Sequence, residues 1–203
     1  MIPPLALATE DELSEAVGIK LLAEHPVLAG IPPRLLRKNG FGYLRSKIDS
    51  WRKMSSQHIV IVLTDLDKKE CPLVLLKDWL GAGMNCPPNL LLRIAVREIE
   101  SWLLADHQAL IKLIGNRGQL PTDPDMLPNP KQYLLKLARN APRAVREDLI
   151  RQKVAISSQG IGYNRRLVEF VKSEWIPERA ATRSPSLSRA RLAIRRMAET
   201  LTS

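Results

Sequence analysis

A short apolar run that ends in two aspartates constrains the fold of this chain more than any other feature. Residues Ile59–Asp67 read I-V-I-V-L-T-D-L-D, and the apolar side chains are β-branched or aliphatic. This pattern is typical of a strand that is buried on both faces of a parallel sheet. Asp65 and Asp67 stand at positions i and i+2, which lie on the same side of an extended backbone. Because ligands bind beyond the carboxyl ends of strands in open α/β sheets, the run predicts a site at this end.

The order of the expected elements indicates the fold class. Apolar runs predict three strands, over residues 5–8, 59–64 and 90–97. Helical spacing and helix-start signals predict helices over residues 13–24, 43–54, 71–80, 131–140, 142–154 and 165–175, in the second half of residues 98–106, and from Ser184 onward. Residues 25–42 are rich in Pro and Gly and predict an irregular connection. Alternating strands and helices predict the α/β class, with a small parallel sheet flanked by helices and a basic α-helical C-terminal part.

The charge of the chain is unevenly distributed. Residues 1–130 carry 15 Lys and Arg against 15 Asp and Glu, whereas residues 131–203 carry 16 against 6, so the whole formal charge of +10 lies in the C-terminal third. We therefore expect an acid-bearing core over residues 1–130 and a basic helical region over residues 131–203, packed on the core, that holds a polyanion. A solvated basic face without a partner is the alternative.

Nucleic acid is the polyanion that such one-sided charge favours. The candidate backbone-binding residues are Lys131, Arg165, Arg166, Arg189, Arg195 and Arg196. No apolar run approaches the roughly 20 residues of a membrane span. The first residues lack the basic and apolar regions of a signal peptide. We therefore expect a cytoplasmic protein.

Acidic residues follow each of the three predicted strands. The clusters are Glu10 with Asp11, Glu12 and Glu15; Asp65 with Asp67; and Glu98 with Glu100. Parallel strands bring their carboxyl ends to one edge of a sheet, so the clusters would form one dense carboxylate site. Such carboxylates repel one another unless a cation lies between them, which predicts a hard divalent ion, Mg²⁺ or Mn²⁺. Metal-assisted displacement at phosphorus uses sites of this kind.

Each cluster also has a purely structural interpretation. Thr9-x-x-Glu12 fits a helix capping box, with acids in the first turn of the helix. Asp65 and Asp67 could be turn residues at a strand end. Glu98 and Glu100 could pair with Arg93 or Arg97 on a partly exposed surface. The sequence leaves both interpretations open for all three clusters.

An ordered set of motifs resembles a known family. An acid after the first strand and a D-x-D after a later strand resemble the Toprim fold of primases, topoisomerases and nucleases of the overcoming-lysogenization-defect type. The fuller pattern resembles a Toprim-related, defence-associated family of uncharacterised prokaryotic proteins. The motifs are T-E-D-E-L-S-E-A-V (Thr9–Val17), L-T-D-L-D (Leu63–Asp67) before Cys71-Pro72, R-E-I-E-S-W-L-L-A-D (Arg97–Asp106), N-P-K (Asn129–Lys131), G-Y-N (Gly162–Asn164) and S-P-S-L-S-R-A (Ser184–Ala190).

The resemblance implies a Toprim/Rossmann-like sheet and Mg²⁺-dependent phosphodiester chemistry. Glu10 would match the Toprim glutamate, which is a general acid or base or a metal ligand. Asp65 and Asp67 would match the metal-binding pair, and Glu98 or Glu100 would extend the metal site. The usual first motif has Gly directly after the glutamate, whereas Asp11 stands there in this chain. Related proteins often work with an ATPase partner, and this chain has no G-x-x-x-x-G-K-[ST] motif of its own.

Two main hypotheses follow, together with a third of another kind. The first is a Mg²⁺-dependent, Toprim-like nuclease that cleaves DNA or RNA in phage defence with an ATPase partner. The second is a non-catalytic nucleic-acid-binding or complex-forming subunit that retains the fold, which the Asp11 substitution motivates. The third is a protein-interaction module whose basic helices dock an acidic partner.

Overall fold

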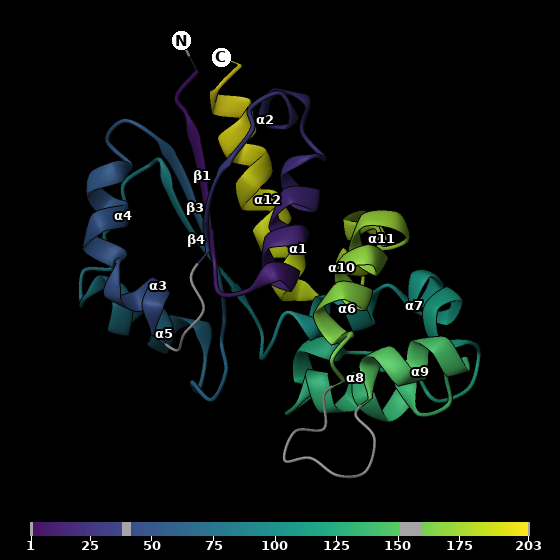
Figure 1. Ribbon diagram of the computed structural model, residues 1–203. Helices are drawn as coiled ribbons and strands as arrows, with labels where there is room; N and C mark the ends of the chain where they lie inside the picture. Colours follow the sequence, from purple (N-terminus) through teal and green to yellow (C-terminus); the bar gives the residue numbers. More distant parts are fainter. Residues whose placement is uncertain (1, 38–41, 151–159, 203) are drawn as a thin grey trace.

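The computed structural model describes residues 2–37, 42–150 and 160–202 of the chain. Within these residues, four strands form one all-parallel sheet in the order β2-β1-β3-β4. The strands are β1 (Leu5–Thr9), β2 (Arg34–Arg37), β3 (Ile59–Asp65) and β4 (Leu90–Ala95). Helices cover both faces of the sheet (Figure 1). The predicted α/β class with a small parallel sheet and a helical C-terminal part is therefore confirmed.

The two central strands are buried, as their apolar sequences predict. Every residue of β1 is buried, and so is every residue of β3 before Asp65. Leu7 and Ile61 face one core, and Ala8 and Val62 face the other. The predicted strands over residues 5–8 and 59–64 are confirmed. The third is shorter than predicted, because β4 ends at Ala95 and the chain bends over residues 96 and 97.

The irregular connection predicted over residues 25–42 is wrong in part. This segment contains α2 (Pro26–Ala29) and the edge strand β2, while residues 38–41 lie outside the described residues. β2 pairs in parallel with β1, from Ala6 opposite Arg34 to Thr9 opposite Arg37. Its side chains are mostly exposed, so it lacks the apolar run by which the buried strands are recognised. Pairing with β1 therefore overrides the local Pro and Gly signals.

The helices form one layer on each face of the sheet. One face is covered by α3 (Tyr43–Ser46), α4 (Ile48–Met54) and α5 (Pro72–Leu80). The single helix predicted over residues 43–54 is interrupted at Lys47, where the backbone leaves the helical region. The opposite face is covered by α1 (Glu12–Leu22) and α12 (Pro185–Thr200), which lie side by side in Figure 1.

The remaining helices lie below α1 and α12 or beside α1 in Figure 1. They are α6 (Glu100–Ala105), α7 (His107–Ile114), the 3₁₀ turn η1 (Pro124–Met126), α8 (Pro130–Ala138), α9 (Arg143–Leu149), α10 (Tyr163–Ser173) and α11 (Pro177–Ala181). Helices α7 and α11 were not predicted, and residues 151–154 of the helix predicted over 142–154 lie outside the described residues. The core beneath α1 continues into residues of α8, α10 and α12, and α10 packs against α1. The domain boundary at residue 130 stays a prediction.

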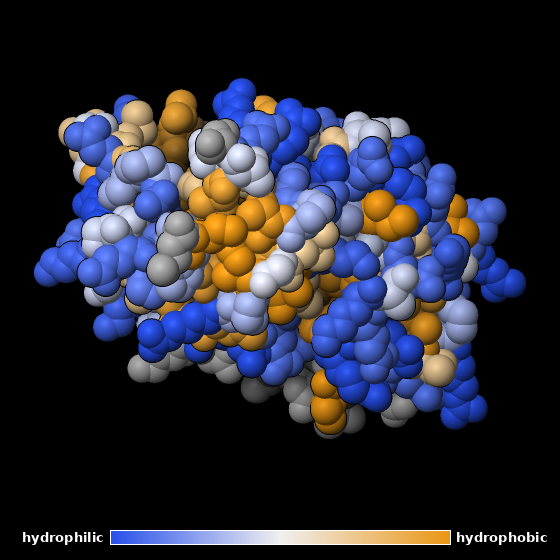
Figure 2. Space-filling model, turned by 90° about the horizontal axis from the view of Figure 1, so that it is seen from above, coloured by the Kyte–Doolittle hydropathy of each residue, from blue (hydrophilic) through white to orange (hydrophobic). Residues whose placement is uncertain are grey.

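Most of the face seen in Figure 2 is hydrophilic. The face that carries both ends of the chain and α2 shows a hydrophobic area near its centre, bordered by hydrophilic side chains (Figure 2). Among residues 2–37, 42–150 and 160–202, no helix combines the length and the apolar character that crossing a membrane requires.

Candidate active site

The crevice between the carboxyl ends of β1 and β3 is the place where this fold would bind a ligand. These strands are neighbours, but the chain leaves them in opposite directions, through α1 to β2 and through α5 to β4. Helix α1 packs on one face of the sheet, and α5 packs on the other. Such a divergence is a topological switch point, and ligands of open α/β sheets bind beyond the carboxyl ends of its strands.

A cavity of about 1060 Å³ opens at this switch point. The described residues that line it include four carboxylates: Glu10, Asp65 and Asp67, which come from two of the predicted acidic clusters, and Asp78. Its other described lining residues are cationic, apolar or small: Arg45, Lys68, Lys69, Leu44, Leu66, Leu75, Trp79, Gly42, Ser46 and Thr64. Acids, cations and an apolar wall therefore face one space.

Glu10 follows the last residue of β1 and points toward β3. Its Oε1 accepts a hydrogen bond from Thr64 Oγ1 at 2.6 Å. Partial burial raises the pKa of the Glu10 carboxyl, and the charges of Asp67 and Asp11 raise it further, against the lowering effect of the Thr64 hydrogen bond. A carboxyl group with a raised pKa is suited to proton transfer near neutral pH.

Asp11 caps the N-terminus of α1. Its Oδ1 accepts a hydrogen bond from the Ser14 backbone N–H at 2.8 Å. The capping-box interpretation with Thr9 as the cap is therefore wrong in register, because Thr9 is the buried last residue of β1. A cap at Asp11 leaves Glu10 in the link between strand and helix, so Glu10 is available to the cavity.

The D-x-D spacing predicts that Asp67 lies on extended backbone, and this prediction is wrong. β3 ends at Asp65, and Asp67 has a φ of 51°, in the left-handed region that Asp tolerates better than most residues. Arg97 holds this conformation: its backbone carbonyl accepts from Asp67 N at 2.8 Å, and its Nη1 donates to the carbonyls of Asp67 at 3.2 Å and Lys69 at 2.6 Å. The Asp67 side chain is thus presented on a turn that β4 supports.

Asp65 is the centre of the acidic cluster. It is partly buried at the end of β3, and burial raises the pKa of its carboxyl well above the usual value. Repulsion from Glu100, Glu10, Asp67 and Asp11 raises that pKa further. Acids that follow β1, β3 and β4 therefore interact through one point at the carboxyl edge of the sheet.

Glu98 and Glu100 follow β4 but have partners of their own. Glu98 Oε2 accepts the Lys131 backbone N–H at 2.8 Å, in the first turn of α8, where amides lack intrahelical partners. Glu100 is buried, and its Oε1 accepts from the Tyr163 hydroxyl at 2.7 Å. Burial raises the pKa of Glu100, opposed by that hydrogen bond and by the charge of Lys131. Neither residue is among the described residues that line the cavity.

The predicted nucleic-acid-binding residues lie in different surroundings. Lys131 Nζ stands 4.9 Å from the centre of the Tyr163 ring, beside the acidic edge. Arg165 and Arg166 both form ion pairs with Asp148, the former at 2.9 Å. Arg195 lies 3.6 Å from Glu199. Arg189 and Arg196 are exposed on α12, and no described carboxylate forms an ion pair with either.

The carboxylates of the cavity suit a magnesium ion in their chemistry. Among residues 2–37, 42–150 and 160–202, no group of three or more His, Cys, Asp or Glu side chains is placed so that it could hold a metal ion by itself. Mg²⁺ is commonly bound through one or two carboxylates, with water and substrate phosphate as the other ligands. The repulsion that raises the pKa values of Asp65 and Glu10 is what a cation would relieve. Asp65 with Glu10 or Asp67 therefore fits the ion.

Comparisons with protein families, with curated proteins and with solved structures found no significant match to this chain. The resemblance to a Toprim-related family thus stays a prediction based on the motifs.

Three residues of this edge were not identified from the sequence as functional. Thr64 is the neutral residue before the D-x-D pair and binds Glu10. Arg97 was considered only as an ion-pair partner of the glutamates, whereas it binds carbonyls of the Asp67 turn. Tyr163 lies 63 positions from Glu100 in the chain, and only its place in the G-Y-N motif signalled it.

Proposed function

We propose that this chain is a Mg²⁺-dependent nuclease whose reaction takes place in the cavity at the carboxyl ends of β1 and β3. The observation that carries the proposal is the convergence of Glu10, Asp65 and Asp67 on one cavity at the topological switch point. Lys68 faces the same cavity and could hold phosphate oxygens, together with Arg45 and Lys69, which also pair with Asp78 at 2.6 and 3.0 Å. Carboxylates for a metal beside cations for a phosphate are the combination that phosphodiester cleavage requires.

The residues take distinct roles in this proposal. Asp65 and Asp67 hold the metal, and bound Mg²⁺ would offset the negative charge that develops on the scissile phosphate. Glu10 accepts the proton of the attacking water on Oε2, because its Oε1 is held by Thr64. Glu100 adds to the negative electrostatic potential at Asp65, and the Tyr163 hydroxyl fixes the position of Glu100. Arg97 keeps Asp67 on the cavity side of the turn.

Cleavage assays with matched variants test this proposal. Plasmid DNA, single-stranded DNA and RNA are incubated with the protein in Mg²⁺, in Mn²⁺ and in EDTA. We expect cleavage only with metal, and Glu10→Gln should reduce the rate by roughly 10²–10⁴-fold, the usual contribution of a general base. The double variant Asp65→Asn with Asp67→Asn should be inactive. Asp49→Asn, the same change at an exposed position on α4, is the control. Cleavage that persists in the double variant would overturn the assignment.

A second candidate function is a non-catalytic nucleic-acid-binding or complex-forming subunit. Two of the four expected metal ligands favour it, because Glu98 already binds the first turn of α8 and Glu100 already binds Tyr163. Titration calorimetry separates the two candidates: the nuclease binds Mn²⁺ and loses this binding in the double variant, whereas the subunit binds nucleic acid in EDTA and takes up no metal. The motif resemblance adds a role in phage defence with an ATPase partner, which would be sought by co-purification.

A further inference from the structure

Arg93 of β4 is a partly buried cation without a described counter-charge. Its Nε is buried, and no described residue accepts a hydrogen bond from it. Burial lowers the pKa of the guanidinium, and the positive charge of Arg189 lowers it further, against the opposing effect of Cys86. Leaving a guanidinium partly buried without an anion is costly, because burial removes part of its hydration. The position therefore favours binding of an anion from outside the chain.

Helix α12 places two more arginines on the flank beside Arg93. Its buried stripe, which includes Leu187, Ala190, Ile194 and Met197, packs on the sheet, and α12 contacts β4. Arg189 and Arg196 are seven residues apart, so they share one side of the helix about 10 Å apart along its axis. The charge of Arg189 lowers the pKa of the Arg93 guanidinium, and the helix of Arg189 contacts the strand of Arg93. Arg93, Arg189 and Arg196 thus form a row, which we call the β4 flank.

Several other arginines of the basic region differ from this row, because they pair with carboxylates. Arg191, on the opposite flank of α12, donates from Nη2 to Glu24 Oε1 at 2.7 Å. Arg165, Arg166 and Arg195 are also paired with carboxylates. Within the described parts of the chain, no ion pair joins an acid to Arg93, Arg189 or Arg196. The β4 flank therefore carries positive charge that no described acid offsets, and Arg93 is its partly buried member.

We propose that the β4 flank binds the phosphate backbone of nucleic acid, with Arg93 and Arg189 gripping one phosphate and Arg196 contacting another. The inference rests on the proposed action on nucleic acid, for which it names the holding surface. A planar guanidinium presents paired donors that match phosphate oxygens. Arg93 lies two residues before the end of β4, about 7 Å of strand from the acidic edge. A backbone held here would lead toward the carboxylates, which favours nucleic acid over an acidic protein.

Binding of a fluorescently labelled single-stranded oligonucleotide, measured by anisotropy in EDTA across a salt series, tests the β4 flank without any cleavage. Arg189→Ala and Arg196→Ala should each weaken binding about tenfold, the loss of one charge-assisted contact. Each should also reduce the slope of log K against log salt by about 0.7, the value for one phosphate contact on a single strand. Arg143→Ala is the control, because Arg143 is 83% exposed and pairs with Glu147 far from this flank.

Three further variants make the test specific. Arg195→Ala removes the same charge one position away, on the other side of the helix, and should weaken binding less than Arg196→Ala. Arg93→Lys keeps the charge but loses the paired donors, and should weaken binding as Arg189→Ala does. Arg196 is exposed, so its variant reports on binding even where a change at Arg93 disturbs folding.

Equal losses of affinity for Arg195→Ala and Arg196→Ala would overturn the proposal that the β4 flank binds the phosphate backbone. Unchanged affinity in the Arg189 and Arg196 variants would also overturn it. Unchanged binding in both variants would leave an acidic protein as the partner for this surface. The proposed nuclease function is tested separately from the β4 flank. Loss of binding in the flank variants without cleavage by the wild-type protein supports the row and points to the non-catalytic subunit. Normal binding by the inactive Asp65 and Asp67 double variant supports both proposals.

Discussion

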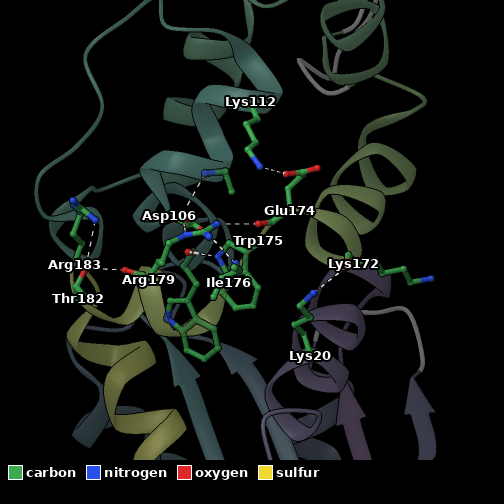
Figure 3. Close-up of polar contacts among 12 residues, drawn as sticks. Lys20, Asp106, Lys112, Lys172, Glu174, Trp175, Ile176, Arg179, Thr182 and Arg183 are labelled. Carbon is green, nitrogen blue, oxygen red and sulfur yellow. Dashed lines mark hydrogen bonds and ion pairs between the residues drawn. The ribbon is translucent and has the colours of Figure 1, made fainter.

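Asp106, which is buried, and Asp65, which is partly buried, have opposite surroundings in this molecule. Asp106, between α6 and α7, is fully buried, and its carboxylate is completely paired. Arg179 donates to both oxygens at 2.9 and 2.8 Å, and the backbone N–H groups of Ile176 and Ala109 donate to one oxygen each (Figure 3). Asp65, at the end of β3, has instead four carboxylates around it that raise its pKa.

The difference separates acids that hold the fold from acids that are available for chemistry. The Asp106 cluster joins α6, α7 and α11, and beside it Trp175 Nε1 donates to the Trp102 carbonyl at 3.0 Å. Its charges are offset within the chain, so an external ion has nothing to add. No described residue forms an ion pair with Asp65, which costs stability and leaves the group receptive to a cation. Perturbed acids that lack a protein partner are therefore the better functional candidates.

The largest effect that this comparison predicts is on stability at Asp106. Asp106→Ala leaves the Arg179 guanidinium and two backbone N–H groups without their acceptor, so we expect a loss of about 3–5 kcal/mol in the free energy of unfolding. Urea denaturation followed by circular dichroism measures it. Asp49→Ala is the matched control, because Asp49 is 82% exposed and forms a surface pair with Arg52. Equal losses in the two variants would contradict the structural role of Asp106.

Tyr163→Phe tests whether the buried side of the acidic edge depends on one hydrogen bond. The change removes the hydroxyl that donates to Glu100 and leaves the ring in place. We expect a loss of about 1.5–3 kcal/mol at neutral pH, the range for a hydrogen bond to a charged group. The loss should shrink as the pH falls through the raised pKa of Glu100, because the protonated group depends less on a donor. Tyr133→Phe, which removes a hydroxyl that donates to the exposed Gln119 carbonyl, is the control and should cost less.

Asp65→Asn should act in the opposite direction. Because the pKa of Asp65 is higher in the folded chain than in the unfolded one, the stability linked to this group is fully present below about pH 4 and is lost as the pH rises through the raised pKa. Asparagine removes this dependence along with the repulsion. We expect the variant to gain about 0.5–2 kcal/mol at neutral pH, the usual exchange of stability for function, and no gain at acid pH.

Unfolding curves of wild type and Asp65→Asn across pH give the difference directly. Groups that do not interact with Asp65, such as Asp148 with its pKa lowered by Arg166, are common to both proteins and cancel in it. A variant that is less stable than wild type at every pH would show that Asp65 is a paired structural acid like Asp106, and the comparison would fail.

How far the sequence leads differs between the sheet and the site. The buried strands β1 and β3 were predictable because an apolar run has few other uses, and parallel pairing then placed Glu10 and Asp65 at one edge. β2 was not predictable, because R-L-L-R on an exposed edge lacks that signal. The turn at Asp67 was not predictable, because D-x-D spacing after a strand indicates extended backbone. Arg97, 30 positions away, stabilises the left-handed conformation of Asp67.

The partners that decide the role of each acid are distant in the chain. Arg179 lies 73 positions from Asp106, and no local pattern links the two. The sequence therefore identified acids at strand ends, but it did not show which of them the fold would neutralise. Glu98 and Glu100 illustrate this, because their partners Lys131 and Tyr163 belong to the basic C-terminal third.

The smallest effect is expected at the exposed neighbour of the Asp106 cluster. Lys112 Nζ lies 2.9 Å from Glu174 Oε2 on the surface, and Glu174 also offers its backbone carbonyl to Arg179 (Figure 3). Lys112 is 67% exposed, so water and salt screen the pair. Lys112→Ala should change the free energy of unfolding by less than about 0.5 kcal/mol, and still less at high salt. A loss as large as that of Asp106→Ala would mean that the stability of this region comes from surface charge rather than from the paired carboxylate. The contrast between Asp106 and Asp65 would then lose its basis.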